Sequence, residues 1–368
     1  MSRHKKNTIG IIEGTGTGQE VAEIFRHVIH AIGGTNTSFL SFKEMYGYLP
    51  HSFLGLSRQY YKKRYSLLRK RIEKEEKDLK TFCLTARSKT SGVFRTAINA
   101  ETLYYLRRDI SSIKVSVLPI RINGKKRRIF FVRDQMQGYY TNDDLACARG
   151  MIKGSFHYSG KKFVTIANFV SGLIRRHKVL SCDLYFLYKF HLFGFELQRM
   201  IEKAVQKTRL DDLCRIAVFQ PDTGIHKLLH DFPAPSNSKD LIVVVGNEIG
   251  DALLETLIHY YDLGTKETFY TLNYAFADKK DKLEVLQTMH GSADDISQMN
   301  ILNPIATLNA AGYALENWLG ILNAQSRMEH LTKEAYQKIY LHPAIKKTNN
   351  TAKTVEYVLS RWKTNGRR

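Results

Sequence analysis

Cysteine is scarce in this sequence, and no cysteine stands close to another. Cys83, Cys147, Cys182 and Cys214 are widely separated and form no CxxC pair. Disulfide frameworks and zinc sites both require closer groupings of cysteine. We therefore expect reduced, mostly buried thiols, which fit a reducing cytoplasm.

Long apolar runs are also missing. The longest strongly apolar run, Leu241–Val245, is far too short to cross a bilayer. The basic amino terminus, Met1–Lys6, leads directly into a strand-like segment, without the apolar core and cleavage site of a signal peptide. Low-complexity tracts and solenoid repeats are absent as well. These absences predict a soluble, cytoplasmic protein that has no membrane partner.

Acidic residues are few compared with basic ones. The chain has 368 residues, with 56 Lys and Arg against 35 Asp and Glu, and its net charge is +21 at pH 7. Such an excess favours anionic partners such as nucleotides, polycarboxylates or nucleic acid. No nucleic-acid-binding motif accompanies it, so a solvated basic surface is the simpler interpretation. Basic residues concentrate in Tyr60–Lys80, Gly124–Arg128 (GKKRR), Arg175–Lys178 and Arg361–Arg368. Because acids are mixed into Tyr60–Lys80, we expect an exposed helix with many salt bridges there.

Apolar, β-branched segments alternate with amphipathic helical ones along the chain. The expected strands are Asn7–Glu13, Lys178–Cys182 and Leu241–Val245, and the expected helices are Gln19–Ile32, Val164–Arg176 and Glu248–Tyr261. Asn123-Gly124 predicts a hairpin turn between Val115–Ile122 and Ile129–Val132. This alternation is typical of the α/β class, with a mainly parallel sheet covered by helices.

Two acidic residues indicate a metal site. Asp251 and Glu255 stand four residues apart on a helix that begins just after Gly246-Asn247, so both carboxylates project from one face. Such a pair suits a hard divalent cation, although two solvated acids on an amphipathic helix give the same pattern. The glycine loop Gly14–Gly18 lacks the spacing of a dinucleotide-binding fingerprint and is weak evidence alone.

A longer pattern carries a family resemblance. His290–Ile296 (HGSADDI), followed by Asn303–Thr307 (NPIAT), resembles the adenosine-binding loop of the isocitrate/isopropylmalate dehydrogenase family, in which H-G-[ST]-A-P leads into N-P. Further segments resemble that family's motifs in the same order along the chain. They are the glycine loop Gly14–Glu20, the substrate helix at Leu106–Arg108, the strand and turn Val132–Tyr140, Asp222, and Asn247–Asp251 with Glu255.

The resemblance implies an isopropylmalate dehydrogenase-like α/β fold, with a mixed central sheet flanked by helices and two domains with a cleft between them. Residues 1–115 and 256–368 would form the larger, nucleotide-binding domain, and residues 116–255 the dimerisation and substrate/metal domain. It also implies NAD-dependent oxidative decarboxylation of a small anionic 2-hydroxy acid of the malate type, with Mg²⁺ or Mn²⁺. The partner would be a second copy in a homodimer with shared active sites, or a family member in a hetero-oligomer.

The same resemblance assigns roles to residues. Arg107 and Arg133 would bind substrate carboxylates, and Tyr140 would be the general acid. The metal would be held by Asp222, Asp251 and Glu255. The cofactor would be bound by Gly16, Thr17, His290, Gly291, Ser292, Ala293, Asp295, Ile296 and Asn303. Asp295-Ile296 stands where NAD-using members carry an acid and isoleucine, which favours NAD over NADP.

The catalytic centre departs from the family pattern. An ungapped register over Arg175–Leu184 places Leu184 where the family's strand, x-V-x-x-V-x-K-A-N, ends in its catalytic lysine, and Val117 replaces a second substrate arginine. Lys189 could substitute only if the strand end is remodelled. Three hypotheses therefore remain open: a divergent NAD-dependent dehydrogenase, a catalytically inactive nucleotide-binding partner or regulatory subunit, and a basic polyanion-binding protein that includes nucleic acid among its ligands.

Overall fold

The chain forms two compact units. The computed structural model describes residues 7–45, 58–98, 100–122, 124–138, 146–148, 151–153, 155–190, 192–233, 239–264, 268–289, 291, 293, 296–340 and 350–365. The first unit comprises Met1–Leu106, Lys266–Leu272 and Leu283–Arg368, and the second comprises Arg107–Thr265 and Asn273–Lys282. The sequence-based division has its boundaries after residues 115 and 255 instead.

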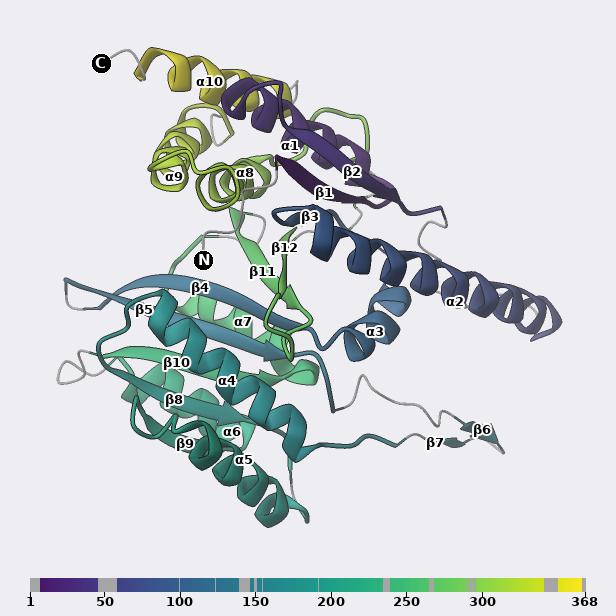
Figure 1. The fold of residues 1–368 in the computed structure, drawn as a ribbon, viewed down its shortest axis with the longest axis vertical. Helices are drawn as coiled ribbons and strands as arrows, with labels where there is room; N and C mark the ends of the chain where they lie inside the picture. Colours follow the sequence, from purple (N-terminus) through teal and green to yellow (C-terminus); the bar gives the residue numbers. More distant parts are fainter. Residues whose placement is uncertain are drawn as a thin grey trace. The chain divides into compact units, whose positions relative to one another are not determined.

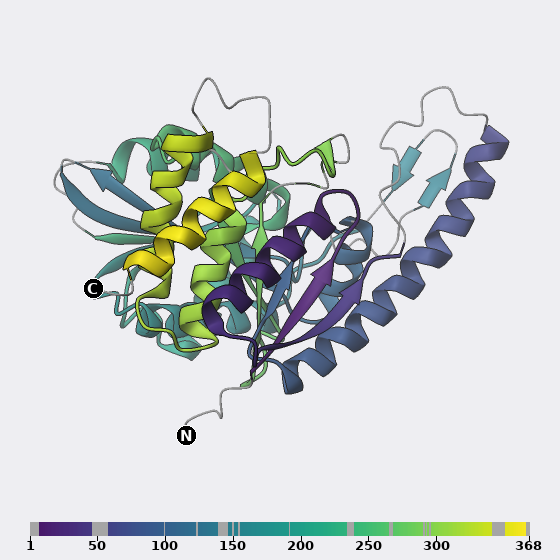
Figure 2. The same cartoon turned by 90° about the horizontal axis from the view of Figure 1, so that it is seen from above.

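The first unit is built on parallel strands. Its strand order is β2-β1-β3-β12, and every neighbouring pair runs parallel. The strands are β1 (Thr8–Glu13), β2 (Ser38–Lys43), β3 (Val93–Arg95) and β12 (Leu283–Thr288), and the helices are α1 (Gly18–Gly33), α2 (Arg58–Lys89), α8 (Ile305–Asn317), α9 (Ala324–Ala335) and α10 (Asn350–Asn365). The predicted first strand and helix are thus confirmed. Phe25 of α1 stacks on Phe94 of β3, with ring centroids 4.0 Å apart, and α10 (yellow) lies beside α1 (purple) in Figure 2.

Helix α2 corrects the expectation of an exposed basic helix. It contains the predicted segment, but Ile72, Leu79 and Phe82 are buried on one face. Glu75, on the same face, is also buried, and its carboxylate accepts the backbone N–H of Met45 at 3.1 Å. Because apolar residues recur at helical spacing among the charges, this helix packs on one side and is solvated on the other.

The second unit contains a mixed sheet, as predicted. Its strand order is β4-β5-β10-β8-β9, in which β4 and β5 form an antiparallel hairpin and the remaining pairs are parallel. In Figure 1, α4 and α5 lie in front of this sheet, and α6 and α7 lie behind it. The strands are β4 (Ile113–Ile122), β5 (Lys125–Asp134), β8 (Cys182–Leu187), β9 (Arg215–Phe219) and β10 (Asp240–Gly246), and the helices are α4 (Gly160–Arg176), α5 (Gly194–Thr208), α6 (Pro221–His226) and α7 (Asn247–Tyr260).

Four further elements are not assigned to one unit above. Helix α3 (Ala100–Asp109) and strand β11 (Tyr270–Ala275) contribute residues to both units, and β6 (Ala146–Ala148) pairs with β7 (Met151–Lys153) in a separate two-stranded sheet. Gly124 has a φ of +77° in the predicted β4–β5 turn, a conformation that glycine adopts without steric cost. No helix in the described part of the chain is long and apolar enough to span a membrane.

The position of β8 corrects the sequence analysis. The predicted strand Lys178–Cys182 is instead the loop that follows α4, because Lys178 has a φ of +49° and Leu180 is 98% exposed. The strand begins at Cys182, and all of its residues are buried. The thiols of Cys83, Cys182 and Cys214 are free and buried, as expected, and the side chain of Cys147 lies outside the described residues.

Candidate functional site

Polar and ionisable residues gather where the parallel strands of the second unit end. Strands β5, β10, β8 and β9 all run in the same direction, so their carboxyl ends meet at one edge of the sheet. Ligands of open α/β sheets bind at this edge. The residues at or just after these strand ends include Asp134, Asn247, Lys189 and Asp222. We refer to this edge as the carboxyl edge.

Arg133, a predicted substrate-binding residue, lies buried near the end of β5. Its guanidinium binds both carboxylate oxygens of Asp251, with Nη2 to Oδ2 at 2.8 Å, and Nη2 also donates to the carbonyl of Asn247 at 3.3 Å. A Cβ at Gly250 would lie 2.5 Å from both Cδ and Nε of Arg133. The glycine of the N-E-I-G-D segment therefore lets the arginine lie against the first turn of α7.

The charges of two more cations act on the same carboxylate. Lys114 is the cross-strand neighbour of Arg133 in the β4–β5 hairpin and is buried. Partial desolvation raises the pKa of Asp251, but the charges of Arg133, Lys114 and Arg107 outweigh this and lower it overall. The structure thus brings together the two predicted substrate arginines, Arg107 and Arg133, and adds Lys114. Such a group of cations attracts and orients anionic groups.

The carboxyl edge also holds two acids whose neutral forms are favoured. Asp134 is fully buried and accepts hydrogen bonds from the Met136 N–H at 2.9 Å, the Gln137 amide at 2.8 Å and the Tyr188 hydroxyl at 3.0 Å. Burial nevertheless raises the pKa of Asp134. Burial also raises the pKa of Glu248, and the nearby Asp134 adds to the effect. Carboxyl groups in such surroundings are candidates for proton transfer.

Several polar atoms beside these acids lack partners. Within the described part of the chain, both side-chain polar atoms of Asn247 are buried without a hydrogen-bond partner, and the buried Glu248 carboxylate has the backbone N–H groups of Glu248 and Lys189 nearby, which lower its pKa. The Glu248 carboxylate lies beside Gly138, where an added Cβ would be 3.4 Å from Oε2. Buried polar groups without partners are costly unless a ligand or water satisfies them. The orphaned atoms therefore fit a polar ligand at the carboxyl edge.

The alignment register that placed Leu184 at the lysine position is wrong. Leu184 lies in the middle of β8, fully buried between β10 and β9, and the strand continues to Leu187. Lys189 follows two residues after the strand end, where it is exposed and its backbone N–H is near enough to lower the pKa of Glu248. Leu184, Leu187 and Lys189 thus match the spacing of V-x-x-V-x-K. The ammonium group at the end of this strand is therefore that of Lys189.

The three predicted metal ligands are not gathered in one chain. Asp251 and Glu255 stand one turn apart on α7 at exposed positions, and Asp222 is exposed on α6. Among the residues that the structure describes, no three His, Cys, Asp or Glu side chains are grouped so that they could hold a metal ion. Asp251 is engaged with Arg133 instead.

The glycine loop of the first unit packs against the end of β3. The N–H of Gly14 donates to Thr96 Oγ1 at 2.7 Å, and a Cβ at Gly18 would lie 2.9 Å from the same oxygen. Gly16, a predicted cofactor residue, has a φ of +61°. Thr17, also predicted to bind the cofactor, is fully buried. Close approach to β3 thus explains two of the glycines without a ligand.

The adenosine-like loop is only partly within the described residues. Gly291 is exposed, Ala293 has a φ of +43°, and the Ile296 N–H donates to the Ala293 carbonyl at 3.2 Å. Asn303 accepts the N–H of Ile305 at 3.1 Å, so its side chain caps the start of α8. The remaining predicted residues, His290, Ser292, Asp295 and Tyr140, lie outside the described residues.

An acidic hollow of about 310 Å³ adjoins the turn that follows this loop. Glu20, Glu23 and Glu356 line it together with Asn300 and Thr351. Burial raises the pKa of Glu20. Carboxylates suit sugar hydroxyls better than phosphates, so the hollow disfavours a phosphate group.

Comparison with known proteins decides the fold. No protein-family model matches this sequence, and no curated protein sequence matches it. Among solved structures, isocitrate dehydrogenase from Methylococcus capsulatus superposes with a TM-score of 0.66, 15% identity and coverage of 96% of this chain and 98% of the other. The TT0538 protein from Thermus thermophilus gives a TM-score of 0.63, also at 15% identity, over 96% of this chain and 67% of that one.

The chain has the isocitrate dehydrogenase fold. This confirms the predicted fold class, although an identity of 15% shows the fold alone. Within the isocitrate dehydrogenase fold, the sequence analysis missed Lys114, Asp134 and Glu248 at the carboxyl edge. Only the hairpin register could have indicated Lys114, because a lysine in an alternating strand usually faces solvent.

Proposed function

We propose that this chain is a divergent member of the isocitrate/isopropylmalate dehydrogenase family that oxidises a malate-type 2-hydroxy acid with NAD. One observation carries the proposal: Arg133 binds Asp251, the charges of Lys114 and Arg107 act on the same carboxylate, and Lys189 follows β8 at the same sheet edge. The cations suit a substrate that bears more than one carboxylate. Lys114 supplies the positive charge that Val117 lacks.

In this mechanism the chain's own residues hold the substrate and move protons. Arg107, Lys114 and Arg133 would fix the carboxylates, and burial of Arg133 would keep its guanidinium oriented. Lys189 would take the hydroxyl proton, and Glu248, whose raised pKa favours its protonated form, would return a proton to the product side. Tyr140 remains a predicted general acid.

Among the described residues, this chain supplies only part of the implied metal site. Asp251 and Glu255 offer hard oxygen donors on one helical face, and the lowered pKa of Asp251 keeps it ionised. Asp222 of the partner subunit would complete the set in a homodimer. Mg²⁺ or Mn²⁺, when bound, would polarise the carbonyl that forms from the hydroxyl group. Gly16, Thr17 and the loop from His290 to Asn303 would hold NAD.

Turnover with a panel of substrates tests the proposal. Purified protein incubated with Mn²⁺, NAD and 3-substituted malates should form NADH, detected by its ultraviolet absorbance. Lys189→Met should lower the turnover about 10²–10⁴-fold, as expected for loss of a general acid or base. The matched control is Lys203→Met, at an exposed position on α5, which should leave turnover within about twofold of wild type. Absence of NADH with every substrate would count against the dehydrogenase.

A second function is an inactive partner or regulatory subunit of a family enzyme. The engagement of Asp251 by Arg133 supports it, since a carboxylate bound on both oxygens has less capacity for a metal. The loss of a lysine at Leu184 no longer supports it. Robust turnover by the isolated wild-type protein would end this alternative.

A further inference from the structure

Two of the basic segments in the sequence meet at the amino ends of the second unit's parallel strands. One is Gly124–Arg128, in the β4–β5 hairpin, and the other is Arg175–Lys178, at the end of α4. Arg128 connects them, since its Nη1 donates to the carbonyl of His177 at 3.2 Å. The rings of Phe130 and His177 also lie against each other, with centroids 5.1 Å apart. This edge of the sheet is opposite the carboxyl edge that forms the candidate active site.

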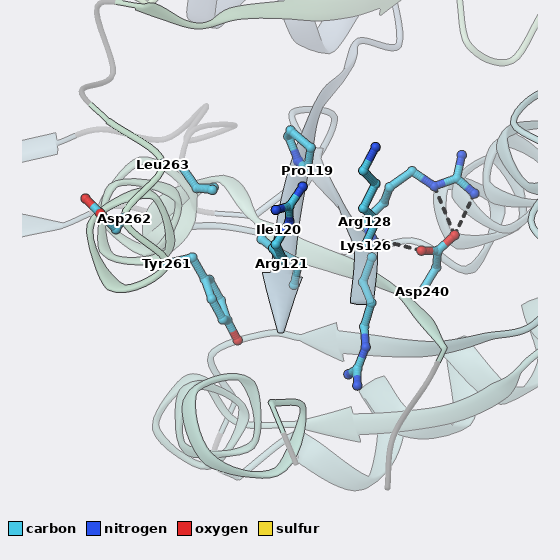
Figure 3. A pocket seen from close by; sticks show the side chains of 10 residues that line it. Pro119, Ile120, Arg121, Lys126, Arg128, Asp240, Tyr261, Asp262 and Leu263 are labelled. Carbon is cyan, nitrogen blue, oxygen red and sulfur yellow. Dashed lines mark hydrogen bonds and ion pairs between the residues drawn. The ribbon is translucent and has the colours of Figure 1, made fainter. Parts of the chain in front are cut away.

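One face of the hairpin carries its cations on the side of α4. Residues of a strand alternate between its two faces, so Lys126 lies on the same face as Arg128. Figure 3 shows these two side chains extending to the same side of the hairpin. Arg121 is the cross-strand neighbour of Lys126 and shares that face. Arg127 belongs to the other face, where it is buried, and takes no part in this surface.

The cations on this side are exposed and are not neutralised locally. We refer to four exposed residues as the basic edge: Arg121, Lys126, Arg175 and Lys178. Within the described ranges their side chains take part in no ion pair. Of the acids nearby, Asp240 is paired with Arg128, and Asp262 turns away from the hairpin in Figure 3. Residues 110–133 and 145–182, which include both basic segments, contain fourteen Lys and Arg and no Asp or Glu.

The positive charge at this edge already affects a neighbouring group. Burial lowers the pKa of His177, and the charges of Arg176 and Arg128 lower it further, to about 4. The dipole of α4 explains the two arginines in its last turn, because cations offset the negative carbonyl end of a helix. It does not explain Arg121 and Lys126, which belong to a different element. An anionic partner accounts for the cations of both elements.

The chemistry of the basic edge favours a double-stranded nucleic acid over other polyanions. Duplex DNA carries one negative charge per about 1.7 Å of its axis, so a duplex lying along this edge presents several phosphates at once. Single strands are held by aromatic side chains on which the bases stack, and the basic edge contains none. A polybasic patch alone holds an acidic membrane weakly, and Leu180 is the large apolar side chain exposed beside this one.

The same residues favour DNA over RNA. Lysine and arginine side chains carry hydrogen-bond donors only. They bind phosphate oxygens but offer no acceptor for the 2′-hydroxyl proton, and the 2′-hydroxyl is the group by which proteins distinguish RNA from DNA. Contacts of this kind carry no sequence information.

We propose that the basic edge binds the phosphate backbone of duplex DNA without sequence selectivity. Arg121 and Lys126 contact one group of phosphates, and Arg175 and Lys178 contact a second. This surface does not depend on the dehydrogenase activity proposed above.

Fluorescence anisotropy of a short labelled DNA duplex, titrated with the full chain over a series of salt concentrations, tests the surface. Four phosphate contacts should give a slope of about −3.6 for log affinity against log salt, at about 0.9 for each contact. Arg121→Gln combined with Lys126→Gln should make the slope shallower by about 1.8, and Arg175→Gln combined with Lys178→Gln should have the same effect. Glutamine keeps a long polar side chain and removes the charge.

The matched control is Lys74→Gln combined with Lys77→Gln. It removes the same charge from exposed positions on α2, where acids are mixed with the bases, and it should leave the slope and the affinity as in wild type. Circular dichroism checks that each variant is folded. The proposal is overturned if wild-type protein shows no binding at low salt or an affinity that does not depend on salt. It is also overturned if the α2 control loses as much affinity as the hairpin variant, or if duplex RNA or phosphatidylserine vesicles bind more tightly than duplex DNA.

Discussion

Each end of the second unit's sheet has an arginine–aspartate ion pair, and the buried partner differs between the two pairs. At the amino end of β10, Arg128 is 35% exposed and its partner Asp240 is 15% exposed. At the carboxyl edge, Arg133 is 5% exposed and its partner Asp251 is 72% exposed. In the first pair the less exposed residue is Asp240, which links β10 to Arg128 of β5. In the second the arginine is enclosed and its partner faces solvent, where a ligand can reach it. The difference indicates that one pair stabilises the fold and the other prepares a site.

The largest expected effect concerns the enclosed arginine. Arg133→Met should lower kcat/KM for the best malate substrate about 10²-fold, because a charge-assisted, two-pronged contact to a carboxylate is lost. Steady-state kinetics measures the change. Arg175→Met, at an exposed position on α4, is the control. If KM and kcat of Arg133→Met were unchanged, the Arg133–Asp251 pair would not form part of a substrate site, and the contrast with the Arg128–Asp240 pair would be wrong.

A smaller effect is expected for the enclosed acid. Asp240→Ala removes the acceptor of Arg128 Nε, Nη2 and backbone N–H and leaves only the Nη1 contact with the His177 carbonyl, so the free energy of unfolding should fall by about 2 kcal/mol. Urea denaturation followed by circular dichroism measures it. Asp212→Ala breaks the exposed Arg209–Asp212 pair, whose side chains are 83% and 54% exposed, and should cost less than about 1 kcal/mol. Equal losses in the two variants would contradict a fastening role for Asp240.

The smallest effect is a pH dependence at the amino end. Burial, with the charges of Arg176 and Arg128, lowers the pKa of His177 from 6.5 to about 4. The unfolded chain therefore binds a proton first as pH falls, and stability is lost between pH 6.5 and about 4. In His177→Gln, the free energy of unfolding should fall by about 1 kcal/mol less over this pH range than in wild type. The figure is small because solvent partly screens the histidine. Unfolding free energies measured across this range provide the test.

The carboxyl edge should respond to pH in the opposite direction. The pKa of Glu248 is raised above 4.5, so the unfolded chain releases its proton first as pH rises, and stability falls from pH 4.5 up to the folded pKa. In Glu248→Gln, the free energy of unfolding should no longer decrease above pH 4.5 for this reason, and the pH dependence caused by His177 should remain. If both variants shift the pH profile in the same direction, the assigned environments are wrong.

The sequence analysis succeeded where a local pattern and the tertiary environment agree. Leu241–Val245 is buried on both faces, so its run of apolar residues identified β10, and the apolar spacing that follows identified α7. The first strand and helix were predicted for the same reason. The family motifs then indicated the fold, although no curated protein sequence matches this chain.

It failed where a choice between neighbouring segments depends on the rest of the molecule. Val179 and Leu180 have the composition of a strand, yet the chain leaves α4 through a turn there and enters the sheet four residues after Lys178. That displacement alone turned Lys189 from a remote candidate into the residue at the strand end. Lys114 was missed because its significance depends on lying opposite Arg133, which no single-strand pattern encodes.

The contact between Gly250 and Arg133 has a consequence for how related sequences can diverge. A side chain at position 250 would displace the arginine, since the three atoms nearest to an added Cβ all belong to Arg133. In an alignment of descendants of this chain, the two positions should therefore covary: lineages that keep the arginine keep the glycine, and lineages that lose the arginine become free to lose the glycine.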